Sequence, residues 1–123
     1  MLKPRSAFSG FSADDISAER SFYADVVGVD VTEEDGMLSL KVGDQTVLVY
    51  PKEDHQPATF TVLNFEVDDI DRAADVLAGA GVTFERYEDF TQDERGIMRD
   101  SGPPIAWFKD PAGNILSIIQ TAG

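Results

Sequence analysis

The chain has 123 residues, with 23 Asp and Glu against 10 Lys and Arg, one His and no Cys, and its formal net charge is −13. This length predicts a single domain over residues 1–123, and the absence of Cys excludes thiol catalysis, iron–sulfur clusters and thiolate zinc sites. The acidity argues against nucleic-acid and membrane partners, because phosphate groups are bound by clustered Lys and Arg. We interpret the charge first as a self-repelling surface that favours solubility, and second as a field that attracts cationic ligands.

The first half of the chain has the pattern of a strand, a helix and three further strands. Residues 6–12 predict the first strand. The helix begins at Asp14 or Asp15 as N-cap, carries apolar residues at near-helical spacing as far as Val27, and ends at Gly28. Apolar and polar residues then indicate strands over residues 29–35, 37–42 and 45–50.

A polar connection between two prolines, residues 51–57, follows the first half and contains His55. A catalytic triad or a His-rich metal site would have to use this one loop histidine. We interpret the segment as an exposed connection, since loop histidines of this kind are mostly not catalytic.

The second half repeats the first at an offset of 54 residues. Phe11-Ser12-Ala13-Asp14-Asp15-Ile16 resembles Phe65-Glu66-Val67-Asp68-Asp69-Ile70, and a helix ending in Gly81 follows the second motif. Strands are predicted over residues 59–67, 82–89, 104–109 and 115–121. The repeats therefore span residues 4–53 and 58–123. The predicted fold class is α+β, with two βαβββ repeats forming curved mixed sheets around a groove and helices on the outer face.

A charged segment, residues 88–104, interrupts the second repeat and is a second candidate site. It carries Asp93, Glu94, Arg95 and Arg99, with Tyr87 just before it. Arg95 could close over an anionic group, because guanidinium binds carboxylate or phosphate bidentately. A solvated surface loop is the alternative.

The carboxylate pairs at the two predicted helix starts, Asp14-Asp15 and Asp68-Asp69, are interpreted as helix caps. Capping and the helix dipole account for acidic residues at these places without any acid–base chemistry.

Three motifs in order resemble the vicinal oxygen chelate superfamily, which includes glyoxalase I, bleomycin-resistance proteins, fosfomycin-resistance enzymes and extradiol dioxygenases. They are Phe22-Tyr23 with Val27-Gly28, the run over residues 65–70, and Phe108-Lys109-Asp110-Pro111-Ala112-Gly113-Asn114-Ile115-Leu116-Ser117 with Gln120 just after. The resemblance covers almost the whole chain and implies a homodimer. It also implies a divalent metal held by His, Gln or Glu on the first and last strands of each repeat.

The four positions that correspond to these metal ligands hold Phe8, Leu48, Val62 and Ser117. Three of the side chains are hydrocarbon and the fourth is a weak hydroxyl ligand, so no metal and no other cofactor is expected. The missing ligands also favour a protein without enzymatic activity.

We expect the groove to be an apolar and aromatic pocket with a few polar groups. Strand alternation places its side chains on one face. The candidate ligand-binding residues are Phe8, Leu48, Tyr50, Phe60, Val62, Asn64, Trp107, Ser117 and Arg95. The alternative is that these side chains fill the groove themselves or form a dimer interface.

Three functions stay open at this point. The first is a metal-free protein that sequesters a small cationic or aromatic ligand, as the bleomycin-resistance branch of the resemblance implies. The second is a lyase, isomerase or dioxygenase of the same superfamily with non-standard or absent metal ligands, and the third is an interaction or regulatory module. With no signal peptide and no long apolar run, the expected location is the cytoplasm.

Overall fold

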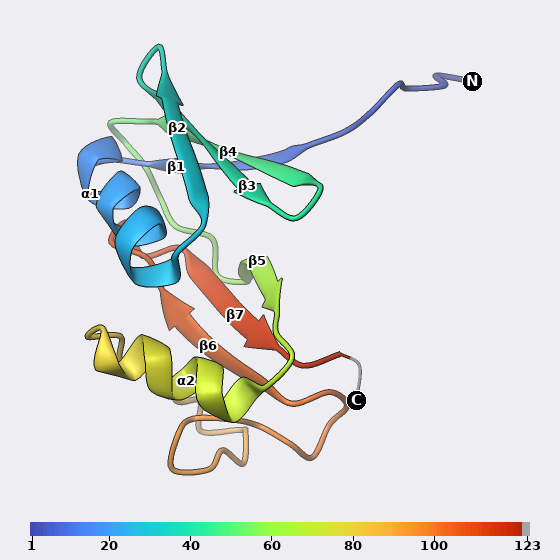
Figure 1. Ribbon diagram of the computed structural model, residues 1–123, viewed down its shortest axis with the longest axis vertical. Helices are drawn as coiled ribbons and strands as arrows, with labels where there is room; N and C mark the ends of the chain where they lie inside the picture. Colours follow the sequence, from blue (N-terminus) through green and yellow to red (C-terminus); the bar gives the residue numbers. More distant parts are fainter. Residues whose placement is uncertain (122–123) are drawn as a thin grey trace. The chain divides into compact units, whose positions relative to one another are not determined.

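The computed structural model describes residues 1–121, and the chain divides into two compact units. The first covers Met1–Gln56 and the second begins at Pro57. Each unit is described by itself (Figure 1). None of the helices in the described part of the chain is long and apolar enough to cross a membrane.

The first unit is a four-stranded mixed sheet with a helical segment. Its strands lie in the order β1-β4-β3-β2, with β1 parallel to β4 and the other pairs antiparallel. Alternate residues of β1, β3 and β4 are buried, so one face forms the core with the ring of Tyr23. The elements are β1 (Ser9–Ala13), α1 (Ile16–Ser21), η1 (Phe22–Val27), β2 (Asp30–Glu34), β3 (Met37–Val42) and β4 (Gln45–Pro51).

The helical segment of this unit begins as predicted and ends as predicted, but its second half differs. Asp15 caps α1 by accepting a hydrogen bond from the backbone N–H of Ala18 at 3.1 Å. Phe22–Val27 form a π-helix rather than a continued α-helix, and Gly28 (φ 87°) ends it by donating its N–H to the carbonyl of Tyr23. This widening was not predicted, because apolar spacing does not separate a π-turn from an α-turn.

The second unit is a three-stranded mixed sheet with one helix beside it (Figure 1). The strands lie in the order β5-β7-β6, with β5 parallel to β7 and β6 antiparallel to it. Phe65, Phe108 and Leu116 of the three strands are buried, together with Ile70 and Leu77 of the helix. The elements are β5 (Thr61–Glu66), α2 (Ile70–Gly79), β6 (Ile105–Lys109) and β7 (Ile115–Ile119).

The predicted cap of α2 is also present. The side chain of Asp69 accepts the N–H of Arg72 at 3.2 Å, and that of Gln120 accepts the N–H of Ile70 at 2.9 Å. Two of the orphan backbone donors at the start of this helix are therefore paired within the second unit.

The predicted α+β class with its βαβββ pattern is confirmed, with one strand prediction wrong. The stretch predicted as a strand over residues 82–89 is not one, although the N–H of Glu85 donates to the carbonyl of Trp107 at 2.8 Å. The side chain of Gln92 instead binds the carbonyl of Glu85 and the N–H of Tyr87. A side chain thus occupies backbone groups that a strand would have paired with a neighbour. Five predicted strands are also shorter at one or both ends than expected: β1 begins at Ser9, β2 covers 30–34, β5 covers 61–66, β6 begins at Ile105 and β7 ends at Ile119.

The two parallel ladders show the internal repeat at the level of register. Gly10 of β1 pairs with Leu48 of β4, and Asn64, which lies 54 residues after Gly10, pairs with Ser117 of β7. Leu48 and Ser117 therefore occupy equivalent positions of the two repeats. A Cβ atom at Gly10 would lie 3.0 Å from the carbonyl oxygen of Leu48, which keeps this ladder position of the first unit tight.

Candidate aromatic pocket

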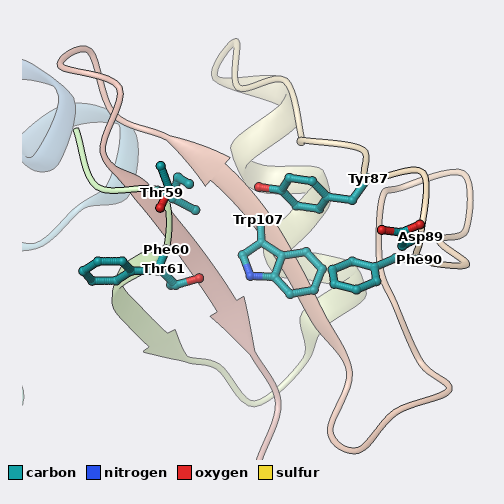
Figure 2. A pocket seen from close by; sticks show the side chains of 8 residues that line it. Thr59, Phe60, Thr61, Tyr87, Asp89, Phe90 and Trp107 are labelled. Carbon is teal, nitrogen blue, oxygen red and sulfur yellow. The ribbon is translucent and has the colours of Figure 1, made fainter. Parts of the chain in front are cut away.

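A pocket of about 420 Å³ opens on the second unit, within the range usual for small-molecule sites. Trp107 of β6 lies at its centre, with Tyr87 and Phe90 from the segment before β6 on one side (Figure 2). The remaining lining residues come from the start of β5 and the two residues before β5, from the loop that carries Tyr87 and Phe90, and from the start of β7. They are Thr59, Phe60, Thr61, Asp89 and Ile115.

Three rings form one wall of this pocket and contact one another. Phe90 stacks on Trp107 with ring centroids 5.2 Å apart and planes at 29°. Tyr87 meets Trp107 edge to face at 5.5 Å and Phe90 at 5.6 Å. Because each ring contacts the other two, the wall is a continuous aromatic surface. Each such ring pair contributes about 0.5–1.5 kcal/mol in addition to the free energy from burying apolar area.

Hydrogen-bond donors are available beside this aromatic wall. The indole nitrogen of Trp107 and the hydroxyl of Tyr87 both point towards the side of the pocket where Thr59 and Thr61 lie (Figure 2). Burial raises the pKa of the Tyr87 phenol, the nearby Glu85 raises it further, and Lys109 partly opposes the change. The phenol therefore stays neutral and can donate at physiological pH.

The charge of the pocket lining is negative. Asp89 is its one carboxylate, and the eight described residues that line it include no Lys or Arg. The nearby ammonium group of Lys109 lies 3.5 Å from a carboxylate oxygen of Glu85. The lining therefore offers an anionic ligand no counter-charge.

Several residues predicted for the groove lie together in the second unit. Ser117 pairs with Asn64 on one side and with Trp107 on the other, and its hydroxyl donates to Oδ1 of Asn64 at 2.5 Å. Phe60 joins Trp107 in the pocket lining. Val62 lies at an irregularity of the β5–β7 ladder, between Thr61 and Leu63.

The predicted groove residues of the first unit are described only within that unit. Leu48 and Tyr50 alternate along β4 with the buried Val47 and Val49. Phe8 precedes β1 and is 68% exposed.

The guanidinium of Arg95 binds a carboxylate of its own unit. Its Nε and Nη2 atoms donate to the two carboxylate oxygens of Asp75 on α2, at 2.9 and 3.2 Å. Arg95 is not among the residues that line the pocket. The bidentate geometry expected of this residue is present, with a protein carboxylate in the place of a ligand.

The residues at the four family metal positions do not fit a divalent metal. The side chains of Phe8, Leu48 and Val62 have no lone pair to donate, and the hydroxyl of Ser117 donates its hydrogen to Asn64. Over residues 1–121 there is no group of three or more His, Asp or Glu that could hold an ion. A hard or borderline divalent cation requires carboxylate, carbonyl or imidazole donors, which these positions do not supply.

The loop histidine has a structural contact within the first unit. Nδ1 of His55 lies 2.6 Å from the hydroxyl oxygen of Ser12 on β1, and the N–H of His55 donates to the carbonyl of Lys52. The histidine thus links the connection to β1 and is half-buried there, whereas the other residues of the connection, 51–54 and 56–57, are exposed as predicted.

Six of the eight residues that line the pocket were not among the predicted groove residues. Phe90, Asp89 and Thr59 lie in segments without regular structure, where strand alternation gives no guide to direction. Tyr87 was noted only as part of a charged loop. The available signal was the aromatic pair Tyr87 and Phe90 in a polar segment, because exposed aromatic side chains in a loop commonly mark contact surfaces.

Asp93 forms hydrogen bonds that hold the same loop, and its titration should make the folding stability of the protein sensitive to acid. Burial raises the pKa of its carboxyl, but hydrogen bonds from the N–H groups of Ile97 and Arg95 and from Arg99 outweigh burial, and the pKa lies below its ordinary 3.8. A depressed folded-state pKa means that the unfolded chain binds more protons. The stabilisation is therefore complete above about pH 5 and is lost as the pH falls through 3.8 and below.

We expect Asp93→Asn to lower the melting temperature at neutral pH and to reduce its decline in acid. Melting curves of both proteins from neutral pH to about pH 3 check this, with Asp44→Asn in the exposed turn between β3 and β4 as the control. Parallel pH profiles for the wild type and Asp93→Asn would contradict the assignment.

The superfamily's sequence profile, described as the Glyoxalase/Bleomycin resistance protein/Dioxygenase superfamily, matches residues 9–118. The chain therefore belongs to this superfamily. No curated protein matches it.

Solved structures with the same fold include both enzymes and binding proteins. Lactoylglutathione lyase from Agrobacterium tumefaciens is 20% identical, with a TM-score of 0.70 over 95% of this chain and 94% of that one. TnmS3, an antibiotic binding protein from Streptomyces sp. CB03234, is 21% identical, with a TM-score of 0.69 over 95% and 97%. Fosfomycin resistance protein FosX from Mesorhizobium loti is 14% identical, with a TM-score of 0.69 over 99% and 95%. Similarity at these identities establishes the fold and leaves the activity to the site.

Proposed function

We propose that the protein binds a small planar ligand, neutral or cationic, in the aromatic pocket of the second unit, without a metal and without catalysis. The observation that carries this proposal is the wall of three mutually packed rings, Tyr87, Phe90 and Trp107, beside hydrogen-bond donors. Stacking surfaces with a few convergent polar groups are the usual composition of small-molecule sites.

The exposure of the pocket's aromatic residues supports ligand binding there. Phe60 is 67% exposed and Phe90 is 42% exposed in the described chain. A planar ligand laid against Trp107 would remove apolar surface from water at roughly 25 cal/mol per Å² of buried area. A stacked cation gains a further contribution of about 0.5–2 kcal/mol from the indole face.

The charge distribution supports selection against anions. Asp89 is at the pocket, and the net charge of the chain is −13. Both features attract a cation and repel a carboxylate or phosphonate. The neutral hydroxyl of Tyr87 and the indole N–H of Trp107 favour ligands that carry a hydrogen-bond acceptor at their edge.

Three tricyclic probes of nearly the same shape test the proposal: cationic 9-aminoacridine, neutral acridine and anionic acridine-9-carboxylate. Calorimetric titration of chelator-treated protein should give binding of the first two, and the carboxylate should bind at least about tenfold more weakly. Because Trp107 is the only tryptophan, the single indole N–H resonance should shift on binding. Binding that requires added metal, or equal affinity for the carboxylate, would contradict the proposal.

A further inference from the structure

The aromatic wall of the pocket is built largely from a segment without regular secondary structure. Tyr87 and Phe90 precede β6 in the chain, and only Trp107 of the three stacked residues lies on a strand. Ordering an irregular segment costs conformational entropy, so a pocket wall made from one needs specific contacts that hold it in place. The contacts of the loop show which side chain provides that fastening.

Gln92 uses both donors of its amide and its carbonyl oxygen on the backbone of this loop. Its Nε2 donates to the carbonyls of Glu85 at 2.9 Å and Gly96 at 2.8 Å. Its Oε1 accepts the backbone N–H of Tyr87 at 2.9 Å. One half-buried side chain therefore ties the start of the loop to its end and holds the backbone of a wall residue directly.

Other contacts fix the far end of the loop around Gly96. The buried Ile97 donates its N–H to the Asp93 carboxylate, and Gly96 (φ 87°) leaves room for Phe84, whose Cβ would lie 2.9 Å from a Cβ added at position 96. This end is therefore a stable support to which the amide of Gln92 connects the backbone of Tyr87.

The ion pairs between the loop and α2 contribute less to this fastening. Arg95 pairs with Asp75, and Arg99 pairs with Asp71 at 2.6 Å, but all four side chains are more than a third exposed. Exposed ion pairs stabilise a protein only weakly, because water screens their charges, and these two pairs act on residues beyond the wall. The three amide hydrogen bonds act on the wall segment itself.

We infer that Gln92 is a positioning residue of the binding site, which holds Tyr87, and through it Phe90, against Trp107 before a ligand arrives. This inference rests on the proposed function. The turn hydrogen bond from the N–H of Phe90 to the carbonyl of Tyr87, at 3.0 Å, transmits the fixed position from one ring to the other. A wall ordered in advance spares the ligand the entropy of ordering it, which raises affinity.

Two variants test the inference. Gln92→Ala removes all three hydrogen bonds. Gln92→Glu keeps the shape and the acceptor for Tyr87 but faces the carbonyls of Glu85 and Gly96 with an oxygen that cannot donate. Gln45→Glu, at an exposed position of β4 in the first unit, is the control for the added charge. Neutral acridine in mildly alkaline buffer is the probe, so that a change of charge at position 92 does not itself alter its attraction.

Both Gln92 variants should bind acridine about tenfold more weakly than the wild type, while Gln45→Glu binds normally. Without ligand, both should lose near-ultraviolet circular dichroism from the ring cluster, and acrylamide should quench Trp107 more readily. Far-ultraviolet circular dichroism should stay unchanged, because the strands and helices keep their own hydrogen bonds. This last measurement separates loss of ring order from loss of the fold.

Two outcomes would overturn the inference: unchanged ring signals in both variants, or loosened rings with undiminished acridine affinity. A third outcome separates the two proposals. If wild-type protein binds none of the three acridines while the variants still loosen Trp107, the proposed function is refuted and the role of Gln92 in ordering the rings is upheld.

Discussion

Trp107→Ala should weaken the binding of 9-aminoacridine by at least about 30-fold, equivalent to about 2 kcal/mol. The indole contacts both other rings of the wall, and it contributes a donor that points into the pocket. Its removal takes away the largest stacking face and leaves Tyr87 and Phe90 without their common partner. Calorimetric titration of chelator-treated protein measures the loss.

Trp107→Phe separates stacking from hydrogen bonding. It keeps a ring on the wall but removes the N–H. With neutral acridine, whose ring nitrogen can accept that N–H, we expect an intermediate loss of about three- to fivefold, the size of one modest hydrogen bond. Val76→Ala, an exposed apolar residue on α2, is the control and should bind normally. Unchanged affinity in a folded Trp107→Ala protein would place the ligand elsewhere.

Asp110→Ala should destabilise the protein by about 3 kcal/mol, because it leaves several buried donors without an acceptor. The carboxylate is 5% exposed and lies in the turn between β6 and β7. One of its oxygens accepts the backbone N–H groups of Ala112 and Asn114, both at 3.0 Å, and the other accepts the side-chain amide of Asn114. Urea denaturation followed by circular dichroism measures the change.

Asp110→Asn is the informative partner of that variant. An asparagine can still accept the two backbone N–H groups, but its own NH₂ would meet the NH₂ of Asn114. We expect a loss of about 1–2 kcal/mol, between the wild type and Asp110→Ala. Equal stability of wild type and Asp110→Ala would show that the turn is held by its backbone alone.

The elements that could be predicted are those with local causes. The cap of α2 at Asp69 and the alternation of β3 each depend on neighbouring residues, and the structure has both. The π-helix at Phe22–Val27 could not be predicted, because it depends on which carbonyl Gly28 reaches after the helix has packed. The prediction of a strand over residues 82–89 was wrong for a similar reason. The side chain of Gln92, several residues further along the chain, forms hydrogen bonds with the backbone groups that a neighbouring strand would otherwise have bound.

The candidate site divides in the same way between local and distant causes. Trp107 follows from strand alternation, since Ala106 and Phe108 on either side are fully buried. Phe90 lies in a turn whose direction is set by contacts with a strand 17 residues later, and no local pattern encodes that distance. The guanidinium of Arg95 had the expected chemistry, but its partner Asp75 lies 20 residues away on α2.

The equivalent ladder positions of the two repeats limit how easily a polar pair like the one in the second half could be introduced into the first half. Asn64 and Ser117 form a polar pair beside the pocket, whereas the equivalent position in the first unit holds Gly10 against Leu48. A side chain introduced at Gly10 would press on a backbone oxygen at 3.0 Å, which cannot move aside as a flexible side chain would. Transplanting the polar pair into the first half therefore requires the β1–β4 ladder to shift first, so the two halves are not interchangeable templates for engineering a second binding site.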